Sequence, residues 1–417
     1  MYKAKKERGR GYCKVEEYDV VVIGGGPAGM AAALGAGELR IENGKLRISD
    51  AGSVVRSEVN DLRSVDNIMW SCERKAKLRV LIVERASRLG GILNQCTHSG
   101  FGLSYFGEEL TGQEYARRFV ERVRSSEIEV LLDTMVMDIS PDRVITVSGT
   151  HTGFRQLSAK AVVLATGCRE RPIGALPVIG SRPSGIFTAG AAQKMINLGG
   201  YDLGNRFVIL GSGDVGLIVA RELAKRSKEV LAVIEKEAAC GGLPRNRVNC
   251  LENYGIPLIT CATVSRVHGM PRVSGVTVMR SGAAQLSVFS GQFSGDEDTG
   301  RLKETFIECD TLITSVGLVP ERELVETLEA PTAQWSGVRS QGSGDEGMRS
   351  EAAQLSVVGG QLSGDDGAGI PEWLFVCGNA DYVHAIVDGV TIESERIGHS
   401  AAQRVWDKSP KLPAALR

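Results

Sequence analysis

Two glycine-rich turns are the parts of this sequence best suited to chemistry. Residues 24–29 read GGGPAG and residues 211–216 read GSGDVG, so both have the spacing G-x-G-x-x-G. The first glycine permits a tight bend, the second lets the backbone approach a diphosphate, and the third lets helix and strand pack closely. Amides at the start of the next helix, with the helix dipole, favour negative charge there. Both turns are therefore predicted to bind a dinucleotide.

The residues around each turn strengthen this interpretation. An apolar run precedes each turn, at residues 18–23 and 206–210, and an alanine- or leucine-rich segment with helical character follows. An acidic residue, Glu84 or Glu235, ends the next apolar run, where it would receive ribose hydroxyls. An isolated turn of this kind could be an ordinary helix entry. Two turns in the same context predict two Rossmann-like nucleotide sites.

Glu235 also bears on the choice of nicotinamide coenzyme. A 2′-phosphate would lie against this carboxylate, and two unit charges 4 Å apart repel by about 4 kcal/mol at an effective dielectric near 20. The sequence therefore favours NAD over NADP. Lys236, Arg245 and Arg247 follow closely and could compensate for the repulsion.

The spacing of the remaining apolar runs indicates a core with insertions. The second strand ends at Glu84, 60 residues after Gly24, whereas a βαβ unit of this kind spans about 30. We therefore expect a surface insertion at about 37–76. Residues 283–296 and 352–365 match at 11 of 14 positions and are rich in Gly, Ser and Asp, so low-complexity insertions are expected at about 281–302 and 336–368.

Composition excludes several classes of function. Lys and Arg total 49 and Asp and Glu total 50, so no net field would attract nucleic acid. We find no apolar stretch long enough to span a bilayer. The nine cysteines and five histidines are scattered, which predicts reduced thiols in a cytoplasmic protein and no metal site.

The chain resembles the pyridine nucleotide-disulfide oxidoreductase superfamily. The resemblance rests on both glycine turns, Glu84, residues 90–93 (GGIL), residues 165–167 (ATG) and residues 377–379 (CGN). It implies an α/β fold with two Rossmann-like FAD/NAD(P)-binding domains, each built of three layers in the arrangement ββα. The FAD domain would be split between residues 15–185 and 319–410, and the NAD(P) domain would be nested at 186–318. In size the chain is similar to thioredoxin reductase.

The motifs and the resemblance together give one set of candidate cofactor residues for FAD and NAD. The FAD candidates are Gly24, Gly26, Pro27, Ala28, Gly29, Glu84, Arg85, Gly91, Ile92, Ala165, Thr166, Gly167, Gly378, Asn379, His384 and Ala385. The NAD candidates are Gly211, Gly213, Asp214, Val215, Gly216, Glu235 and Gly317. Asp214 could instead cap its helix, and His384 could be a capping or core residue.

Three departures from the superfamily matter for function. Residues 187–196 lack the C-x-x-C of thioredoxin reductases, and only Cys96 follows residues 90–91 where glutathione reductase relatives carry C-x4-C. The closing Gly-Asp, whose Asp meets the flavin ribityl chain in the family, is Gly378-Asn379 here. Asn379 can still hydrogen-bond a hydroxyl, or Asp381 could take that role instead. Cys96 could be a redox thiol, but a small buried residue is the preferred interpretation.

Without a dithiol, electrons must leave the flavin by another route. The segments around Cys96, Cys168 and the second turn are similar to FAD/NAD subunits associated with glycerol-3-phosphate dehydrogenase, sarcosine and opine oxidases, and dye-linked proline dehydrogenase. We therefore expect an FAD-dependent NAD(P)H oxidoreductase with a partner dehydrogenase subunit or other acceptor. The alternatives are a thiol or peroxide reductase using Cys96 and a non-catalytic cofactor-binding subunit. Homo- or hetero-oligomers, and the direction of electron flow, stay open.

Overall fold

The computed structural model describes residues 15–42, 45–48, 76–151, 153–280, 286–287, 303–326, 328 and 371–408. These residues form two compact units. Unit 1 contains the described residues up to Leu93, those of His98–Gly167 and those from Glu321 onward. Unit 2 contains Asn94–Thr97 and the described part of Cys168–Pro320, so it interrupts unit 1 in the sequence.

Unit 1 alternates strands and helices before and after unit 2 in the chain. Its elements are β1 (Glu16–Ile23), α1 (Pro27–Glu38), β2 (Leu39–Glu42), β3 (Lys45–Ile48), β4 (Ala76–Lys77), β5 (Val80–Val83), η2 (Gly91–Gln95, shared with unit 2), β6 (Ser99–Phe101), β7 (Leu110–Thr111), α2 (Gly112–Ser125), β8 (Glu129–Leu131), β9 (Thr134–Ile139), β10 (Val144–Gly149), β11 (Gly153–Leu164), α6 (Glu323–Glu326), β24 (Leu374–Val376), η5 (Gly378–Ala380) and α7 (Val387–Lys408).

The main sheet of unit 1 has seven strands. Its order is β8-β5-β1-β11-β10-β9, and β24 also pairs with β11. Strands β8, β5, β1, β11 and β24 are parallel, whereas β10 and β9 continue in antiparallel fashion. The apolar run of β1 is buried throughout its last four residues, as a central parallel strand requires.

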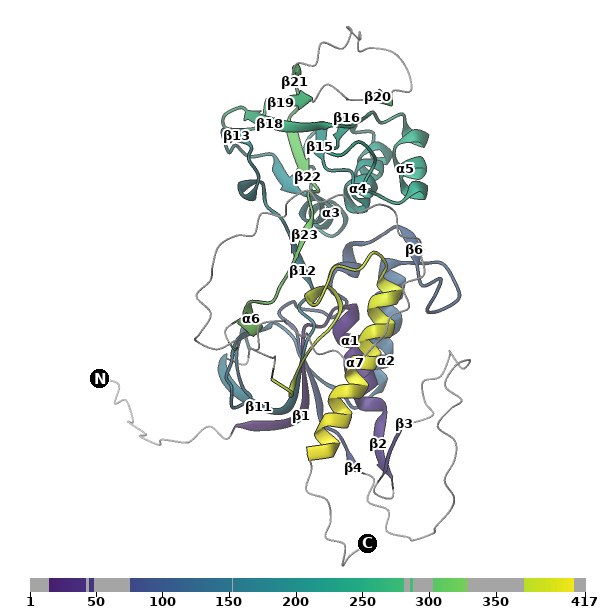
Figure 1. Ribbon diagram of the computed structural model, residues 1–417, viewed down its shortest axis with the longest axis vertical. Helices are drawn as coiled ribbons and strands as arrows, with labels where there is room; N and C mark the ends of the chain where they lie inside the picture. Colours follow the sequence, from purple (N-terminus) through teal and green to yellow (C-terminus); the bar gives the residue numbers. More distant parts are fainter. Residues whose placement is uncertain are drawn as a thin grey trace, which may run out of the picture. The chain divides into compact units, whose positions relative to one another are not determined.

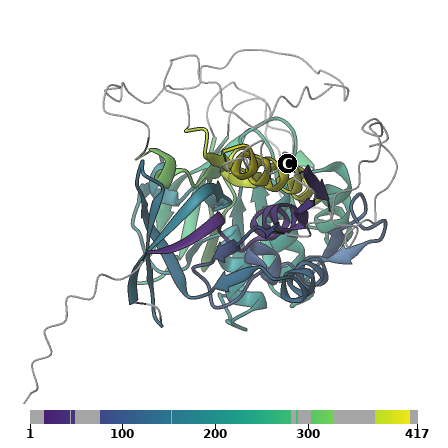
Figure 2. The same cartoon turned by 90° about the horizontal axis from the view of Figure 1, so that it is seen from below.

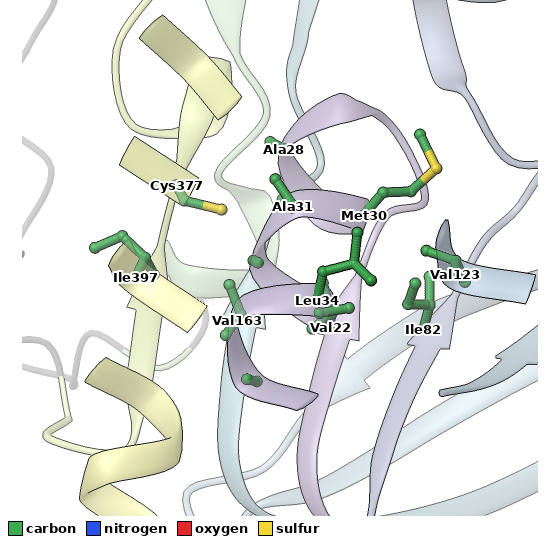
Figure 3. Packing of buried hydrophobic residues seen from close by; sticks show 14 of the residues in the cluster. Val22, Ala28, Met30, Ala31, Leu34, Ile82, Val123, Val163, Cys377 and Ile397 are labelled. Carbon is green, nitrogen blue, oxygen red and sulfur yellow. The ribbon is translucent and has the colours of Figure 1, made fainter. Parts of the chain in front are cut away.

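Helices α1, α2 and α7 form the layer on one face of this sheet (Figures 1 and 2). The backbones of α1 and α7 approach closely because a Cβ on Gly35 or Gly398 would lie 2.4 or 2.0 Å from a carbonyl oxygen of the other helix. Their shared core is aliphatic (Figure 3), and its labelled members include Val22, Ala28, Ala31, Leu34, Val163 and Ile397. A second core on the opposite face includes Val136 and Ile145 of the antiparallel strands.

Unit 2 repeats this plan. Its elements are β12 (Cys168–Glu170), η3 (Ile173–Ala175), β13 (Ile179–Gly180), β14 (Ile186–Thr188), α3 (Ala189–Asn197), β15 (Arg206–Leu210), α4 (Asp214–Lys225), β16 (Glu229–Ile234), α5 (Pro244–Cys250), η4 (Glu252–Tyr254), β17 (Leu258–Ile259), β18 (Ala262–His268), β19 (Gly275–Arg280), β20 (Leu286–Ser287), β21 (Lys303–Ile307), β22 (Thr311–Thr314) and β23 (Leu318–Pro320).

The layers of unit 2 are two sheets and a set of helices. Strands β14-β22-β15-β16-β17 are parallel, and the antiparallel β20 ends this sheet. One core joins the sheet to α3, α4 and α5. A second core joins it to the sheet β13-β18-β19-β21. The predicted α/β fold of two Rossmann-like units with ββα layers is confirmed, whereas the assignment of FAD and NAD(P) to particular residue ranges stays a prediction.

The predicted insertions fall mostly outside the described residues. The repeat at 352–365 lies wholly outside them, and of the repeat at 283–296 only β20 is described. The first insertion differs from the expected irregular segment in its described part, because β2, β3 and β4 pair as a small antiparallel sheet. The alternating residues of β2 (LRIE) and β3 (KLRI) account for this pairing.

Candidate functional site: two dinucleotide cradles

The first turn needs glycine at two positions for packing and leaves a third open. Gly24 has φ +108°, and a Cβ there would lie 2.4 Å from the Ala165 carbonyl oxygen. A Cβ on Gly29 would lie 1.8 Å from the Gly24 oxygen. At Gly26, by contrast, the nearest atom to an added Cβ is the Gly91 Cα at 3.9 Å. A Cβ at Gly26 would therefore make only ordinary van der Waals contact, which leaves room for a diphosphate to approach its backbone.

Helix α1 begins directly at this open position. Pro27 occupies its first residue, and the Met30 N–H donates to the Gly26 oxygen at 3.0 Å. Amides before Met30 in the first turn, such as that of Ala28, have no acceptor within the helix by geometry. Proline lacks an N–H and suits this position. The predicted residues Gly26, Pro27 and Ala28 thus have the geometry of a helix start that can receive an anion.

Glu84 lies beside the turn, as its position after β5 predicted. Its carboxylate is buried and accepts the Gly25 N–H at 2.6 Å through Oε2 and the Ala86 N–H at 2.7 Å through Oε1. A carboxylate can accept further bonds, so a ribose contact is compatible with this arrangement. Glu84 therefore also positions the turn, which the sequence argument did not foresee.

A loop after β5 covers the turn from another side. The Gly90 N–H donates to the Gly25 oxygen at 2.8 Å, and Gly91 has φ +53° and lies against Gly26. Ile92 is 57% exposed next to this contact. Arg85 turns away and pairs with Glu321 at 3.6 Å. Gly91 and Ile92 are therefore at the cradle, whereas the Arg85 side chain binds another loop.

The segment after β11 reaches the same end of the sheet. The Ala165 N–H donates to the Ile23 oxygen at 2.8 Å. The Thr166 hydroxyl donates to the Glu321 oxygen at 2.6 Å, and the Glu321 N–H donates to the Gly167 oxygen at 2.9 Å. These bonds fix residues 165–167 at the carboxyl end of the sheet, where ligands bind in α/β folds.

The loop after β24 also contacts the cradle. Gly378 has φ +60°, and a Cβ there would lie 2.7 Å from the Cβ of Ala28. The Asn379 Oδ1 accepts the His384 N–H at 3.0 Å. His384 is inward-facing and Ala385 is exposed. The structure therefore places Gly378 of this loop against α1.

Asp381, the sequence alternative to Asn379 for the flavin ribityl chain, has another partner. The Arg322 guanidinium contacts its Oδ1 at 3.0 Å and also donates to the Ala380 oxygen at 2.8 Å. Burial raises the pKa of Asp381, while Arg322 opposes that shift. This pairing favours Asn379 over Asp381 as the residue that would face a ligand. Arg322 itself was missed by the sequence argument.

The second turn has the same geometry in unit 2. Gly211 has φ +99°, and its added Cβ would lie 2.0 Å from the Ser315 carbonyl oxygen. A Cβ on Gly216 would lie 2.8 Å from the Gly211 oxygen. At Gly213 the nearest atom would be the Ser315 Oγ at 3.8 Å. The Leu217 N–H donates to the Gly213 oxygen at 3.1 Å, so α4 starts as α1 does.

Glu235 stands beside the second turn as Glu84 stands beside the first. Its Oε2 accepts both the Ser212 N–H at 2.9 Å and the Ser212 hydroxyl at 2.5 Å, and its Oε1 accepts the Glu237 N–H at 3.0 Å. Glu235 is partly exposed, unlike Glu84. The role of Ser212 could have been anticipated from its position inside the glycine turn, which the acidic residue was predicted to adjoin.

Asp214 does not cap helix α4, so that alternative is wrong. The N-cap is Gly213, without a side-chain cap bond. The Asp214 Oδ1 instead accepts the Leu243 N–H at 2.8 Å and the Asn246 Nδ2 at 2.7 Å. A carboxylate at the first helical residue is stabilised by the helix dipole while it also fixes the next loop.

The two remaining NAD candidates, Val215 and Gly317, differ in their surroundings. Val215 packs against the core of unit 2. Gly317 has φ +104° with no atom within 4 Å of an added Cβ, and its oxygen accepts the Arg171 N–H at 3.1 Å. Val215 is thus a packing residue, whereas Gly317 leaves open space after β22.

A second glycine pair extends the similarity between the cradles. Gly90-Gly91 follow Glu84 with the spacing E-x5-G-G, and Gly241-Gly242 follow Glu235 with the same spacing. The Gly241 N–H donates to the Ser212 hydroxyl at 2.7 Å, and a Cβ on Gly242 would lie 2.6 Å from Leu217. Comparing the sequence with itself around the two glutamates would have revealed this pair.

Cys96 lies in unit 2, in the short segment Asn94–Thr97. It is 8% exposed, and its Sγ is 4.0 Å from the Gln193 Oε1. Burial, and to a smaller extent Glu222, raise its thiol pKa to about 12. Such a thiol is protonated at neutral pH and is a poor nucleophile. The geometry therefore favours a packing role.

Within the described ranges, no group of His, Cys, Asp or Glu is arranged to hold a metal ion. The part of the chain that the structure describes also contains no helix long and apolar enough to cross a bilayer. All the described cysteines, which include Cys96 and Cys377, are free thiols.

Comparisons with known proteins agree with two dinucleotide cradles. The chain is 24% identical over 313 residues to the hydrogen cyanide synthase subunit HcnB of Pseudomonas protegens, covering 74% of this chain and 58% of that protein. It is 28% identical over 224 residues to an opine oxidase subunit of Agrobacterium tumefaciens, covering 52% of this chain and 37% of that protein. It thus spans less than two thirds of these relatives.

The fold is also that of a solved enzyme. T. acidophilum thioredoxin reductase superposes with a TM-score of 0.58 at 17% identity, covering 95% of this chain and 100% of that one. The sequence matches the family described as pyridine nucleotide-disulphide oxidoreductase over residues 18–364, most of the chain. The protein therefore belongs to the pyridine nucleotide-disulphide oxidoreductase family, whose members bind FAD and NAD(P)H.

Proposed function

We propose that this protein is an FAD-dependent oxidoreductase that passes electrons between a nicotinamide dinucleotide, FAD and a partner dehydrogenase subunit or other acceptor. FAD would bind at the first turn and the nicotinamide dinucleotide at the second. The observation that carries the proposal is the pair of cradles, each closed by two tightly packed glycines and less crowded at a third, Gly26 or Gly213. Bound FAD supplies the hydride chemistry, and the protein supplies position and charge.

The surroundings of Glu235 support NAD as the coenzyme. Its carboxylate accepts bonds from Ser212 and Glu237, which keeps the charge fixed where a 2′-phosphate would approach. Arg247 pairs with Glu252 at 3.0 Å, so one of the three cations named as possible compensators is engaged elsewhere. NADH is therefore the expected donor.

The chemistry of the cysteines supports a partner protein as the acceptor. The sequence lacks both C-x-x-C and C-x4-C, and the Cys96 thiol has its pKa raised to about 12 by burial. The two relatives named above are described as subunits. An acceptor outside this chain is therefore a better proposal than a thiol relay within it.

Gly26→Ala and Gly213→Ala test the two cradles separately. Each methyl would make only ordinary van der Waals contact with the protein, since its nearest neighbours lie 3.9 and 3.8 Å away, but it would occupy the space of an approaching diphosphate. We expect Gly26→Ala to lose at least tenfold in FAD affinity. Gly213→Ala should keep its flavin but require at least tenfold more NADH to bleach it anaerobically. Gly37→Ala is the control, because its Cβ would also make ordinary contact, 3.6 Å from Ile128, and Gly37 lies in helix α1, which follows the first turn.

The outcomes distinguish the alternatives. Wild-type protein that binds no flavin contradicts the proposal. Flavin that binds but is not bleached by NADH or NADPH supports a non-catalytic cofactor-binding subunit. Cys96→Ser that abolishes turnover with thiol or peroxide substrates, while NADH-to-dye transfer continues, supports the reductase alternative. Transfer to a co-purifying protein that Cys96→Ser leaves unchanged supports the proposal.

A further inference from the structure

The strand order of unit 1 indicates where the two halves of a dinucleotide would lie. The parallel strands run in the order β5-β1-β11-β24, and Glu84 follows β5 while the glycine turn follows β1. A ribose on Glu84 and a diphosphate at the turn place the other half over the ends of β11 and β24. The loop at residues 377–386, which follows β24, is therefore on the side of the redox-active half.

This loop holds one histidine in a fixed position. Gly378 packs on Ala28, and the Asn379 Oδ1 accepts the backbone N–H of His384 at 3.0 Å. Arg322 binds Ala380 through its carbonyl oxygen at 2.8 Å. The His384 side chain is 8% exposed, and its ring lies 3.9 Å from that of Tyr382.

His384 faces a carboxylate from helix α7. Its Nε2 is 2.7 Å from the Glu393 Oε2. Both atoms are buried, neither has another hydrogen-bond partner, and their mutual angle is outside the range of a good hydrogen bond. The Nδ1 lies 4.0 Å from the position of a Cβ on Gly389, in the first turn of α7. An imidazole can bind and release a proton, and a neighbouring carboxylate stabilises its charged form.

The other charged and titratable groups around His384 are accounted for. Asp381 pairs with Arg322 at 3.0 Å, and burial raises the pKa of both Asp381 and Tyr382. Asp388, at the start of α7, accepts the amides of residues 102, 104 and 105. Glu393 is thus the carboxylate that contacts the His384 ring.

We propose that His384 and Glu393 form a proton-binding pair that serves the redox half of the dinucleotide in the first cradle. This inference rests on the proposed function, because it requires FAD there. Hydride from NADH would deliver two electrons and one proton to the redox-active half of the dinucleotide, and one net negative charge would remain there. His384 takes up one further proton from solvent, becomes an imidazolium held by Glu393, and balances that charge. Reoxidation releases the proton to solvent.

The test measures the flavin midpoint potential against pH, from about pH 5.5 to 8.5 on either side of the usual histidine pKa, with dye-calibrated anaerobic titrations. Within this range, the plot of midpoint potential against pH for the wild-type protein should change its slope by the equivalent of one proton per two electrons. His384→Asn and Glu393→Gln should each remove or displace that change while FAD loading, read from visible absorbance, stays within threefold of wild type. Either variant suffices if the other does not fold.

His399→Asn is the matched control, because His399 lies on α7, the helix that carries Glu393, and its Nε2 is 3.8 Å from the Glu38 carboxylate. It should keep the wild-type slope. Unchanged slopes in His384→Asn or Glu393→Gln, with flavin bound and bleached by NADH, overturn the proton-binding pair and leave the proposed function standing. A wild-type protein that binds no FAD overturns both.

Discussion

The two glycine turns reach one geometry with different residues around them. In unit 1 the acidic residue Glu84 is buried and binds two backbone amides, whereas in unit 2 Glu235 is partly exposed and binds the hydroxyl of Ser212 as well. The first turn is followed by Pro27 and the second by Asp214, whose carboxylate holds the next loop. Both cradles are thus fixed by backbone amides, and the second has additional hydrogen bonds to the side chains of Ser212 and Asp214.

This difference teaches that the two cradles should respond differently to substitution. A site fixed by backbone packing tolerates little change, because neighbouring atoms cannot move aside. A site fixed by side-chain hydrogen bonds can rearrange and exchange its ligand more readily. We expect permanent binding in the first cradle and reversible binding in the second.

The sharpest test of the comparison is alanine at the third glycine of each turn. A methyl on Gly29 would lie 1.8 Å from a carbonyl oxygen, whereas one on Gly216 would lie 2.8 Å from its counterpart. We expect Gly29→Ala to destabilise the protein by about 3 kcal/mol or more and Gly216→Ala by about 1–2 kcal/mol. Urea unfolding measures both. Equal losses would mean that the two turns are equally rigid.

The acidic residues give the next largest effect. The Glu84 carboxylate oxygens accept one buried and one part-buried amide N–H, and Glu84→Gln replaces one of these oxygens by a donor, so we expect a loss of about 2–3 kcal/mol and of bound FAD. Glu235→Gln should cost about 1 kcal/mol or less, because water can reach this side chain. Thermal unfolding and visible absorbance measure these effects. A larger loss at Glu235 would reverse the comparison.

Coenzyme choice tests the second cradle alone. Glu235→Ala removes the charge that opposes a 2′-phosphate, so the ratio of kcat/KM for NADPH over NADH should rise at least about tenfold, which corresponds to about 1.4 kcal/mol. Glu237→Ala, a neighbouring exposed carboxylate, is the control. A ratio that stays constant in Glu235→Ala would show that NAD specificity lies elsewhere.

Alkaline pH gives the smallest effect. Burial raises the pKa of Cys377 in unit 1 and of Cys96 and Cys309 in unit 2 to about 12, from a usual value of 9.0. Above about pH 9 the unfolded thiols ionise while the folded ones stay protonated, so stability falls as pH rises. Cys377→Ala should remove up to one proton from that slope.

Denaturant unfolding at about pH 8, 9 and 10 measures this slope. Alanine at both Cys96 and Cys309 should remove up to two protons from it, and alanine at the partly exposed Cys168 is the control. A wild-type stability that is flat over this range would show that these thiols ionise in the folded protein.

The glycine spacing and the pattern of apolar runs were sufficient to predict the local geometry of both cradles. The runs at 18–23 and 206–210, the glycine spacing and the two terminal glutamates all describe local structure, which depends on neighbouring residues. The core strands and the long helix α7 follow from the same local patterns.

Contacts between distant residues could not be predicted in this way. Arg322 binds Ala380 and Asp381, some 58 residues on, and nothing in the local sequence of either segment indicates that pairing. The contact between His384 and Glu393 is nearer in sequence but depends on the turn before α7. Tertiary packing decides such contacts, so they require coordinates.

The short segment Asn94–Thr97 has a practical consequence for anyone who dissects this protein. It belongs to unit 2 although the residues on both sides of it belong to unit 1. The Gln95 amide donates to the Gly190 oxygen at 2.8 Å, and Asn197 donates to the Gln95 oxygen at 2.9 Å. A fragment excised at residues 168–320 would lack these four residues and leave α3 without its partner. Truncation at the apparent boundary would therefore yield an incomplete fragment, whereas a circular permutant or a fusion that restores the tetrapeptide could be complete.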